Sequence, residues 1–151
     1  MAMTLYAFSI ELMIHGYHEY KVVWDNPVVG ENLLCEREIG NPHNTHAVAV
    51  KKVIDGNLTV VGHIPRRISS ICSIFLRRGG TIDCTVDGSR RYSSNIPQGG
   101  LEIPYVLTFT AQSSVEGNKA EKLIESALAA KCSKVPNPVQ GESSRFAIEY
   151  Q

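Results

Sequence analysis

The chain has 151 residues, which fits one globular domain with a short extension, and its hydrophobic share of 43% is ordinary for a globular protein. The formal net charge is zero, and no apolar run reaches the roughly 18 residues of a membrane span, so we expect no membrane partner. The first twenty residues lack a basic stretch and include Glu11, unlike a secretory signal peptide, and we expect an intracellular protein, nuclear or cytoplasmic.

Four strands are predicted before residue 65, each rich in alternating or β-branched apolar residues: 6–15, 32–38, 47–53 and 58–64. The first has the clearest pattern, because Phe8, Ile10, Leu12 and Ile14 alternate with residues that face the other way. The last two strands are joined by a tight turn at 55–57, which predicts a hairpin.

The hydrophobic period changes after residue 64. Five apolar residues recur there at the spacing of one helical face: Ile68, Ile71, Cys72, Phe75 and Leu76. This pattern predicts a helix over Pro65–Arg78, with proline in its first turn and a glycine pair after its end. We expect this helix to plug or cap one end of the folded strands.

Two further strands are predicted, over 81–93 and 101–111, and the first of them leads into a bend at Asp87-Gly88. A second helix is predicted over 118–131. Asn118 and Glu121 have the spacing of a capping box, which favours a helix start at Asn118.

Six short antiparallel strands and two helices predict a mainly β protein, built as a small six-stranded barrel of the OB or SH3 type. One helix lies between strands four and five, and the other is appended at the C-terminal side. We assign 1–112 to the barrel domain, 113–131 to a linker and the C-terminal helix, and 132–151 to a loose tail. Alternating apolar residues near the end of this tail could add an edge strand to its own or a neighbouring chain.

The cysteines indicate free thiols rather than a disulfide framework. They are widely spaced, and three of them stand in apolar segments: Cys35, Cys72, Cys84 and Cys132. Inward-facing thiols are poor nucleophiles, and the chain has no nucleophile elbow, phosphate loop or dinucleotide fingerprint. The sequence therefore predicts no enzymatic activity.

Two histidine pairs, His15 with His18 and His43 with His46, raise the question of a zinc site. Zinc needs four ligands, usually on spacings such as paired CxxC or a helical HExxH, and neither pattern is present. We therefore expect no bound metal and no other cofactor.

Charge is distributed unevenly along the chain. Residues 1–50 carry two basic and six acidic side chains, whereas residues 51–91 carry eight basic and three acidic ones. The basic residues of the second segment form four doublets: Lys51-Lys52, Arg66-Arg67, Arg77-Arg78 and Arg90-Arg91. The doublets could meet in space and bind an anion, or they could be solvated ends of strands and helices.

Planar and cationic side chains gather in two short segments, His43 with Asn44 and His63 with Arg66 and Arg67. An imidazole can stack on a base, an amide both donates and accepts hydrogen bonds, and arginines at a helix start can neutralise a phosphate. This combination suits single-stranded nucleic acid, although a plain strand-to-helix corner would use the same residues.

The segments "CEREIGNPHNTHAVAVKKV" (35–53) and "LTVVGHIPRRIS" (58–69) resemble the core signature of HIRAN domains, small β-barrel modules of SNF2-type proteins. The resemblance covers about 8–111. It implies a module that captures the 3′-hydroxyl end of single-stranded DNA, in the DNA-repair setting of stalled replication forks.

The resemblance also implies a role for individual residues. His43 takes the place of an aromatic residue that stacks near the terminal base, and Asn44 that of an aspartate that holds the 3′-hydroxyl. His63 matches the histidine of the second motif, and Arg66 matches a lysine that contacts DNA.

Three further residues complete the predicted site. Tyr17 and His18 fall near an arginine–tyrosine pair of the family's first strand, and Arg67 adds charge at the helix start. The chain departs from the family pattern by its His43 and Asn44, and by the absence of the first-strand arginine.

Two functions stay open from the sequence. The first is a non-catalytic module that binds single-stranded DNA ends or another nucleic acid, which the basic doublets favour. The second is a protein-interaction module on the same barrel that has lost DNA-end binding, which the acidic N-terminal segment and the zero net charge favour.

Overall fold

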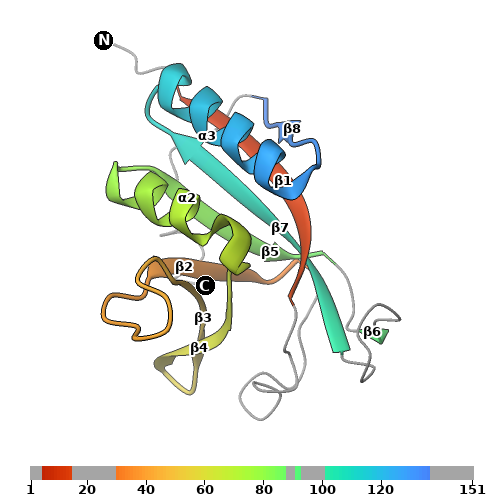
Figure 1. The fold of residues 1–151 in the computed structure, drawn as a ribbon. Helices are drawn as coiled ribbons and strands as arrows, with labels where there is room; N and C mark the ends of the chain where they lie inside the picture. The colour runs from red at the N-terminus through yellow and green to blue at the C-terminus, as the bar shows by residue number, and fades with distance from the viewer. Residues whose placement is uncertain (1–4, 15–29, 88–90, 93–100, 137–151) are drawn as a thin grey trace.

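The computed structural model describes residues 5–14, 30–87, 91–92 and 101–136 (Figure 1). Its elements follow one another as β1 (Tyr6–Ile14), β2 (Asn32–Arg37), β3 (Val48–Ile54), β4 (Asn57–His63), α2 (Arg66–Arg77), β5 (Thr81–Val86), β6 (Arg91–Tyr92), β7 (Leu101–Ala111), α3 (Ser114–Leu128) and β8 (Ser133–Lys134). None of the helices in these ranges has the length and apolar character that crossing a membrane requires.

The strands form one antiparallel sheet in the order β4-β3-β2-β5-β7-β1-β8, and β6 pairs with β7 off this path. All six predicted strands are present, and β6 and β8 are short additions. Within the predicted strand over 81–93, β5 ends at Val86, just before the predicted bend, and Arg91–Tyr92 pair with β7 as β6. The pairing of β1 with β7 is long and runs from Tyr6↔Ala111 to Ile14↔Ile103.

The sheet is open, so the prediction of a closed six-stranded barrel is wrong. Seven strands lie along its path, and the two end strands, β4 and β8, do not pair with each other in the part of the chain that the structure describes. Both helices lie on the same side of the sheet in Figure 1, where they form a second layer. A sheet whose apolar face is covered by helices need not close on itself to build a core, so α2 lies across the face instead of plugging an end.

One buried cluster joins the sheet to both helices. Phe8 and Phe109, opposite each other on β1 and β7, stack with ring centroids 4.7 Å apart. Phe75 of α2 meets Phe109 edge-on at 5.4 Å, and Ile124 of α3 is fully buried in the same cluster. Both helices therefore contribute side chains to the core.

The start of α3 differs from the prediction. Ser113, and not Asn118, is the N-cap residue, and its side chain accepts a hydrogen bond from the backbone N–H of Glu116 at 3.2 Å. Ser113 with Glu116 has the same capping-box spacing as Asn118 with Glu121, and the helix begins at the earlier of the two signals. Gly117 lies so close to the Tyr6 ring of β1 that an added Cβ would overlap it.

The first residues of the predicted tail belong to the sheet. Ser133 and Lys134 pair with Ser9 and Phe8 at the free edge of β1, and the N–H of Val135 donates to the carbonyl of Ala7 at 3.0 Å. The alternating apolar residues later in the tail, within 137–151, lie outside the described residues.

Candidate functional site

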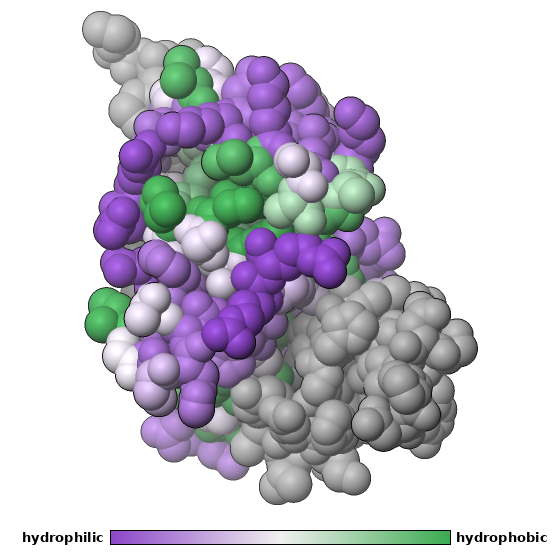
Figure 2. All heavy atoms as spheres, in the orientation of Figure 1, coloured by the Kyte–Doolittle hydropathy of each residue, from purple (hydrophilic) through white to green (hydrophobic). Residues whose placement is uncertain are grey.

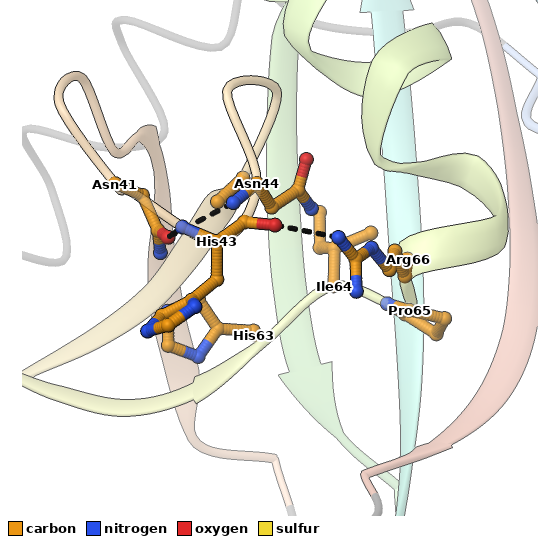
Figure 3. A pocket seen from close by; sticks show the side chains of 8 residues that line it. Asn41, His43, Asn44, His63, Ile64, Pro65 and Arg66 are labelled. Atoms are coloured by element: carbon orange, nitrogen blue, oxygen red, sulfur yellow. Dashed lines mark hydrogen bonds between the residues drawn. The ribbon is translucent and has the colours of Figure 1, made fainter.

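A pocket of about 340 Å³ opens where the loop between β2 and β3 meets the N-terminus of α2 (Figure 3). Eight residues line it: Asn41, His43, Asn44, Ala47, His63, Ile64, Pro65 and Arg66. They come from two segments that the hairpin of β3 and β4 brings together, with Ala49 opposite His63. The pocket thus unites His43, Asn44, His63 and Arg66, four of the seven predicted site residues.

The loop that carries His43 is shaped by an asparagine–proline turn. Asn41 Oδ1 accepts hydrogen bonds from the backbone N–H groups of His43 at 2.8 Å and Asn44 at 3.0 Å. Proline at 42 restricts the backbone further, and Gly40 has a φ of 90°, which favours glycine. The side chain of His43 is therefore held at the pocket by an ordered turn.

Asn44 ties this loop to α2. Its Oδ1 accepts from the backbone N–H of His46 at 3.0 Å, and its Nδ2 donates to Ser69 Oγ at 3.1 Å. Ser69 Oγ in turn donates to the carbonyl of Arg66 in the first turn of the helix. An asparagine amide has two donor hydrogens and two acceptor lone pairs, so one of each is left for a ligand.

Glu38 does not line the pocket itself but contacts two residues that do, Asn41 and His63. Its Oε1 accepts from Asn41 Nδ2 at 2.6 Å and lies 3.0 Å from His63 Nε2. These two contacts, with Asn41 the stronger, lower the pKa of the Glu38 carboxyl, and partial burial opposes them. One carboxylate therefore positions both the asparagine of the turn and the imidazole of the second segment.

The effect of Glu38 on stability should depend on pH. Its pKa in the folded protein lies below the ordinary value of 4.5, so the carboxylate stabilises the fold above that value. The contribution is lost as the pH falls below 4.5 and through the folded pKa. We expect Glu38→Gln to cost about 1 kcal/mol at neutral pH and this cost to vanish in acid, as measured by urea unfolding across pH. Asp55→Asn, at an exposed turn position, is the control, and equal pH dependence of the two variants would contradict the role of Glu38.

Arg66 lines the pocket on the side of α2. Its Nη2 donates to the carbonyl of His43 at 2.5 Å, as the dashed line in Figure 3 shows, and its other guanidinium hydrogens are available. The first turn of α2 has no side-chain cap and no acidic residue. Its backbone N–H groups and the helix dipole therefore add positive potential beside the guanidinium.

Three of the predicted site residues remain. Arg67 is exposed at the helix start but does not line the pocket, and Tyr17 and His18 lie outside the described residues.

Reasoning from sequence missed Asn41 and Glu38. The asparagine–proline turn was a usable signal for Asn41, whereas nothing in the local sequence marks Glu38 as an acceptor.

Among the residues that the structure describes, the basic doublets do not form one patch, and Arg90 of the fourth doublet lies outside these residues. Lys51 and Lys52 on β3 pair with Glu36 at 3.1 Å and Glu31 at 2.6 Å. Arg78, at the far end of α2 from the pocket, pairs with Glu116 at 3.4 Å. Positive charge near the pocket is therefore confined to the start of α2, within the part of the chain that the structure describes.

The histidines of the pocket do not belong to any group of three possible metal ligands among the described residues. One such group lies elsewhere, where ligand atoms of Glu121, Glu125 and Cys132 are within 4.8 Å of one another. Its groups already have protein partners, because Tyr6 donates to Glu121 and the N–H of Cys132 donates to Glu125 Oε2 at 2.8 Å. Burial and the two glutamates raise the pKa of the Cys132 thiol to about 12, which disfavours the thiolate that metals bind.

No family model matches the sequence, and no curated protein matches it either. Solved structures do match. The crystal structure of the HIRAN domain of human HLTF aligns with a TM-score of 0.56 and 16% identity, over 81% of this chain and 93% of that chain. This chain has a HIRAN-like fold. The NMR structure of the HLTF HIRAN domain in its DNA-bound conformation aligns with a TM-score of 0.55 and 17% identity, over 82% and 90% of the two chains.

The resemblance in residues 35–53 and 58–69 is thus confirmed at the level of the fold. In this HIRAN-like fold each of the two resembling segments contributes one strand of the β3–β4 hairpin, and residues of both segments line the pocket.

Proposed function

We propose that this HIRAN-like chain is a non-catalytic module that binds single-stranded DNA at its 3′-hydroxyl end, in the pocket between the β2–β3 loop and α2. The observation that carries the proposal is the composition of this pocket. Two imidazoles, an amide and a guanidinium converge beside an uncapped helix N-terminus. The DNA-bound HLTF domain of the same fold supports nucleic acid as the class of ligand.

Each group of the pocket has a distinct task in this proposal. The exposed ring of His43 stacks on the terminal base, which is worth roughly 1–3 kcal/mol. Arg66 and the first N–H groups of α2 bind a phosphate, so affinity falls with salt. Asn44 uses its remaining donor or acceptor on the terminal hydroxyl, a neutral hydrogen bond worth about 1 kcal/mol.

The first test is a fluorescence-anisotropy titration of the whole chain with labelled single-stranded DNA at two salt concentrations. We expect binding that weakens with salt and that is stronger for a 3′-hydroxyl than for a 3′-phosphate. A lack of binding at low salt would show that the proposal is wrong. If strands with either end bind equally well, the pocket binds single strands but does not recognise the 3′-hydroxyl.

Asn44→Ala should remove the discrimination between the two ends. We expect the Kd for a 3′-phosphate strand to exceed that for a 3′-hydroxyl strand about fivefold in the wild type, and the ratio to fall to about one in the variant. Ser69→Ala is the matched control, because it breaks the Asn44–Ser69 tie and leaves the amide in place. If Ser69→Ala also brings the ratio to one, Asn44 acts through the loop and not on the hydroxyl.

A protein-interaction module is the second candidate. The pairing of Lys51, Lys52 and Arg78 with glutamates favours it, since little unpaired basic surface remains around the pocket in the described ranges. It takes the place of the first proposal if the titration shows no DNA binding.

A further inference from the structure

The pocket contains a titratable pair to which the proposed function gives no task. His63, at the end of β4, lines the pocket (Figure 3), and its Nε2 lies 3.0 Å from Oε1 of Glu38. The other imidazole, the amide and the guanidinium of the pocket each have a task in the proposed function, whereas His63 has none. Histidine is the side chain whose charge ordinarily changes between about pH 5 and 8. The pair can therefore change the charge of the pocket within that range.

The surroundings of the pair suit a change of charge. The side chains of His63 and Glu38 are 34% and 29% exposed, so the imidazole can exchange protons with solvent while the protein limits the screening of both charges. The pKa of the Glu38 carboxyl is lowered, chiefly by the hydrogen bond from Asn41, so Glu38 stays ionised between pH 5 and 8. The pair thus carries one negative charge while His63 is neutral, and no net charge once His63 is protonated.

The charges around the pair make this difference important for an anion. Arg66 of α2 and His43 of the β2–β3 loop line the same pocket. Lys51 of β3 acts on Glu38 from the other side and is itself paired with a second glutamate at 3.1 Å. With both imidazoles neutral, the positive charge of Arg66 is opposed by the negative charge of Glu38. Protonation of His63 cancels the charge of Glu38 and leaves Arg66 unopposed.

A second hollow, of about 190 Å³ between α2 and α3, cannot supply such a response. Its lining is mainly apolar, and Figure 2 shows the corresponding hydrophobic patch in the region of the two helices, bordered by hydrophilic residues. No histidine lines this hollow, and its Arg78 is paired with Glu116 at 3.4 Å. Among these two hollows, only the pocket at the start of α2 combines a histidine with charged partners for a phosphate.

We propose that the His63–Glu38 pair is a proton switch, which strengthens the binding of the strand's phosphate in the pocket as the pH falls from 8 to 6. This inference rests on the proposed DNA binding and adds a control of the same pocket. A bound phosphate favours the protonated imidazole, and by linkage the protonated imidazole favours the phosphate by the same factor. The switch acts through charge, so it holds whichever hydrogen bonds the ring makes.

The test is a fluorescence-anisotropy titration of the full chain at pH 6 and at pH 8, at one salt concentration. The probe is a labelled oligothymidine that ends in a 3′-hydroxyl and keeps its own charge over this range. We expect the Kd to be about tenfold lower at pH 6 than at pH 8. Equal Kd values would overturn the switch and leave DNA binding intact. A lack of binding at both pH values would overturn the proposed function, and the switch with it.

Histidine variants identify the group that titrates. His63→Gln should bind the strand with the same Kd at both pH values, because glutamine does not titrate. His46→Gln is the matched control, since His46 is exposed on the same loop as His43 but does not line the pocket, and the tenfold change should persist. If His63→Gln keeps the pH dependence and His43→Gln or His46→Gln removes it, another imidazole titrates and the inference is overturned.

Glu38→Gln separates the charge of the pair from its structural support. Removal of the negative charge should strengthen DNA binding at pH 8, by a factor similar to that gained by lowering the pH in the wild type. A variant that only loosens the turn at Asn41 would instead weaken binding at both pH values, and that result would overturn the switch.

Calorimetry provides a second readout that does not depend on the affinity. In two buffers with different ionisation enthalpies, DNA binding to the wild type should take up as much as about one proton per chain near pH 6.5. His63→Gln should take up clearly less. Equal uptake by the two proteins would overturn the assignment to His63.

Discussion

Replacing Ile124 by alanine is expected to lower the free energy of unfolding by about 2–5 kcal/mol, the range for large-to-small changes in a packed core. Ile124 is fully buried in the cluster that contains Phe8 and Phe109, although it belongs to a helix near the C-terminal side of the chain. The three lost carbon atoms would leave a cavity between α3 and the sheet that the backbone can close only in part. Chemical denaturation of the wild type and the variant measures the difference.

Val115→Ala is the control for this experiment. Val115 lies in the same helix but is 76% exposed, so its truncation should change stability by less than about 0.5 kcal/mol. If Ile124→Ala is equally mild, α3 is a loosely attached extension and not a layer of the core. A large effect of Ile124 alone would establish the helix as part of the folding unit.

Replacing Arg66 by alanine is expected to weaken the binding of every single-stranded DNA about 10- to 100-fold, if the pocket binds DNA as proposed. A hydrogen-bonded charge of this kind is worth about 1.5–3 kcal/mol, and 1.4 kcal/mol corresponds to a factor of ten. The variant also loses the bond that holds the carbonyl of His43, so part of the effect reflects a looser loop. Because one phosphate contact is removed, the slope of log K against log salt should flatten by about 0.7.

Arg77→Ala is the matched control for Arg66→Ala. Both arginines are exposed and stand on α2, but Arg77 lies in the last turn, at the other end from the pocket. The two variants have the same net charge, so they separate binding at the pocket from attraction to the whole protein. Equal weakening by both would mean that the strand follows the helix surface and does not end in the pocket.

The N-terminal end of α2 borders the pocket through Pro65 and Arg66. The helix is anchored by Ile68, Cys72 and Phe75, which are buried against the sheet. The core therefore holds Arg66 at the pocket without the help of a ligand.

Local periodicity was sufficient to predict the six main strands and α2. Alternation along β1 and the step to helical spacing after His63 depend only on neighbours in the sequence, and the structure agrees within a few residues. The grouping of His43 and Asn44 with His63 and Arg66 was also predictable. The two pairs flank one hairpin, and hairpin pairing is set by a short turn, here with Asp55 and Gly56 both at positive φ.

The sequence by itself therefore determined the six main strands, α2 and four of the residues that line the pocket, since these follow from short-range geometry. Only the tertiary structure decided that the sheet stays open, because closure depends on whether β4 and β8 pair and on the helices that cover the face. It also decided the start of α3, where two capping signals stand in the sequence and only Ser113 caps the helix. The tertiary structure also decided the role of Glu38. Its carboxylate contacts both Asn41 and His63, which are 22 residues apart in the sequence and come together only in the fold.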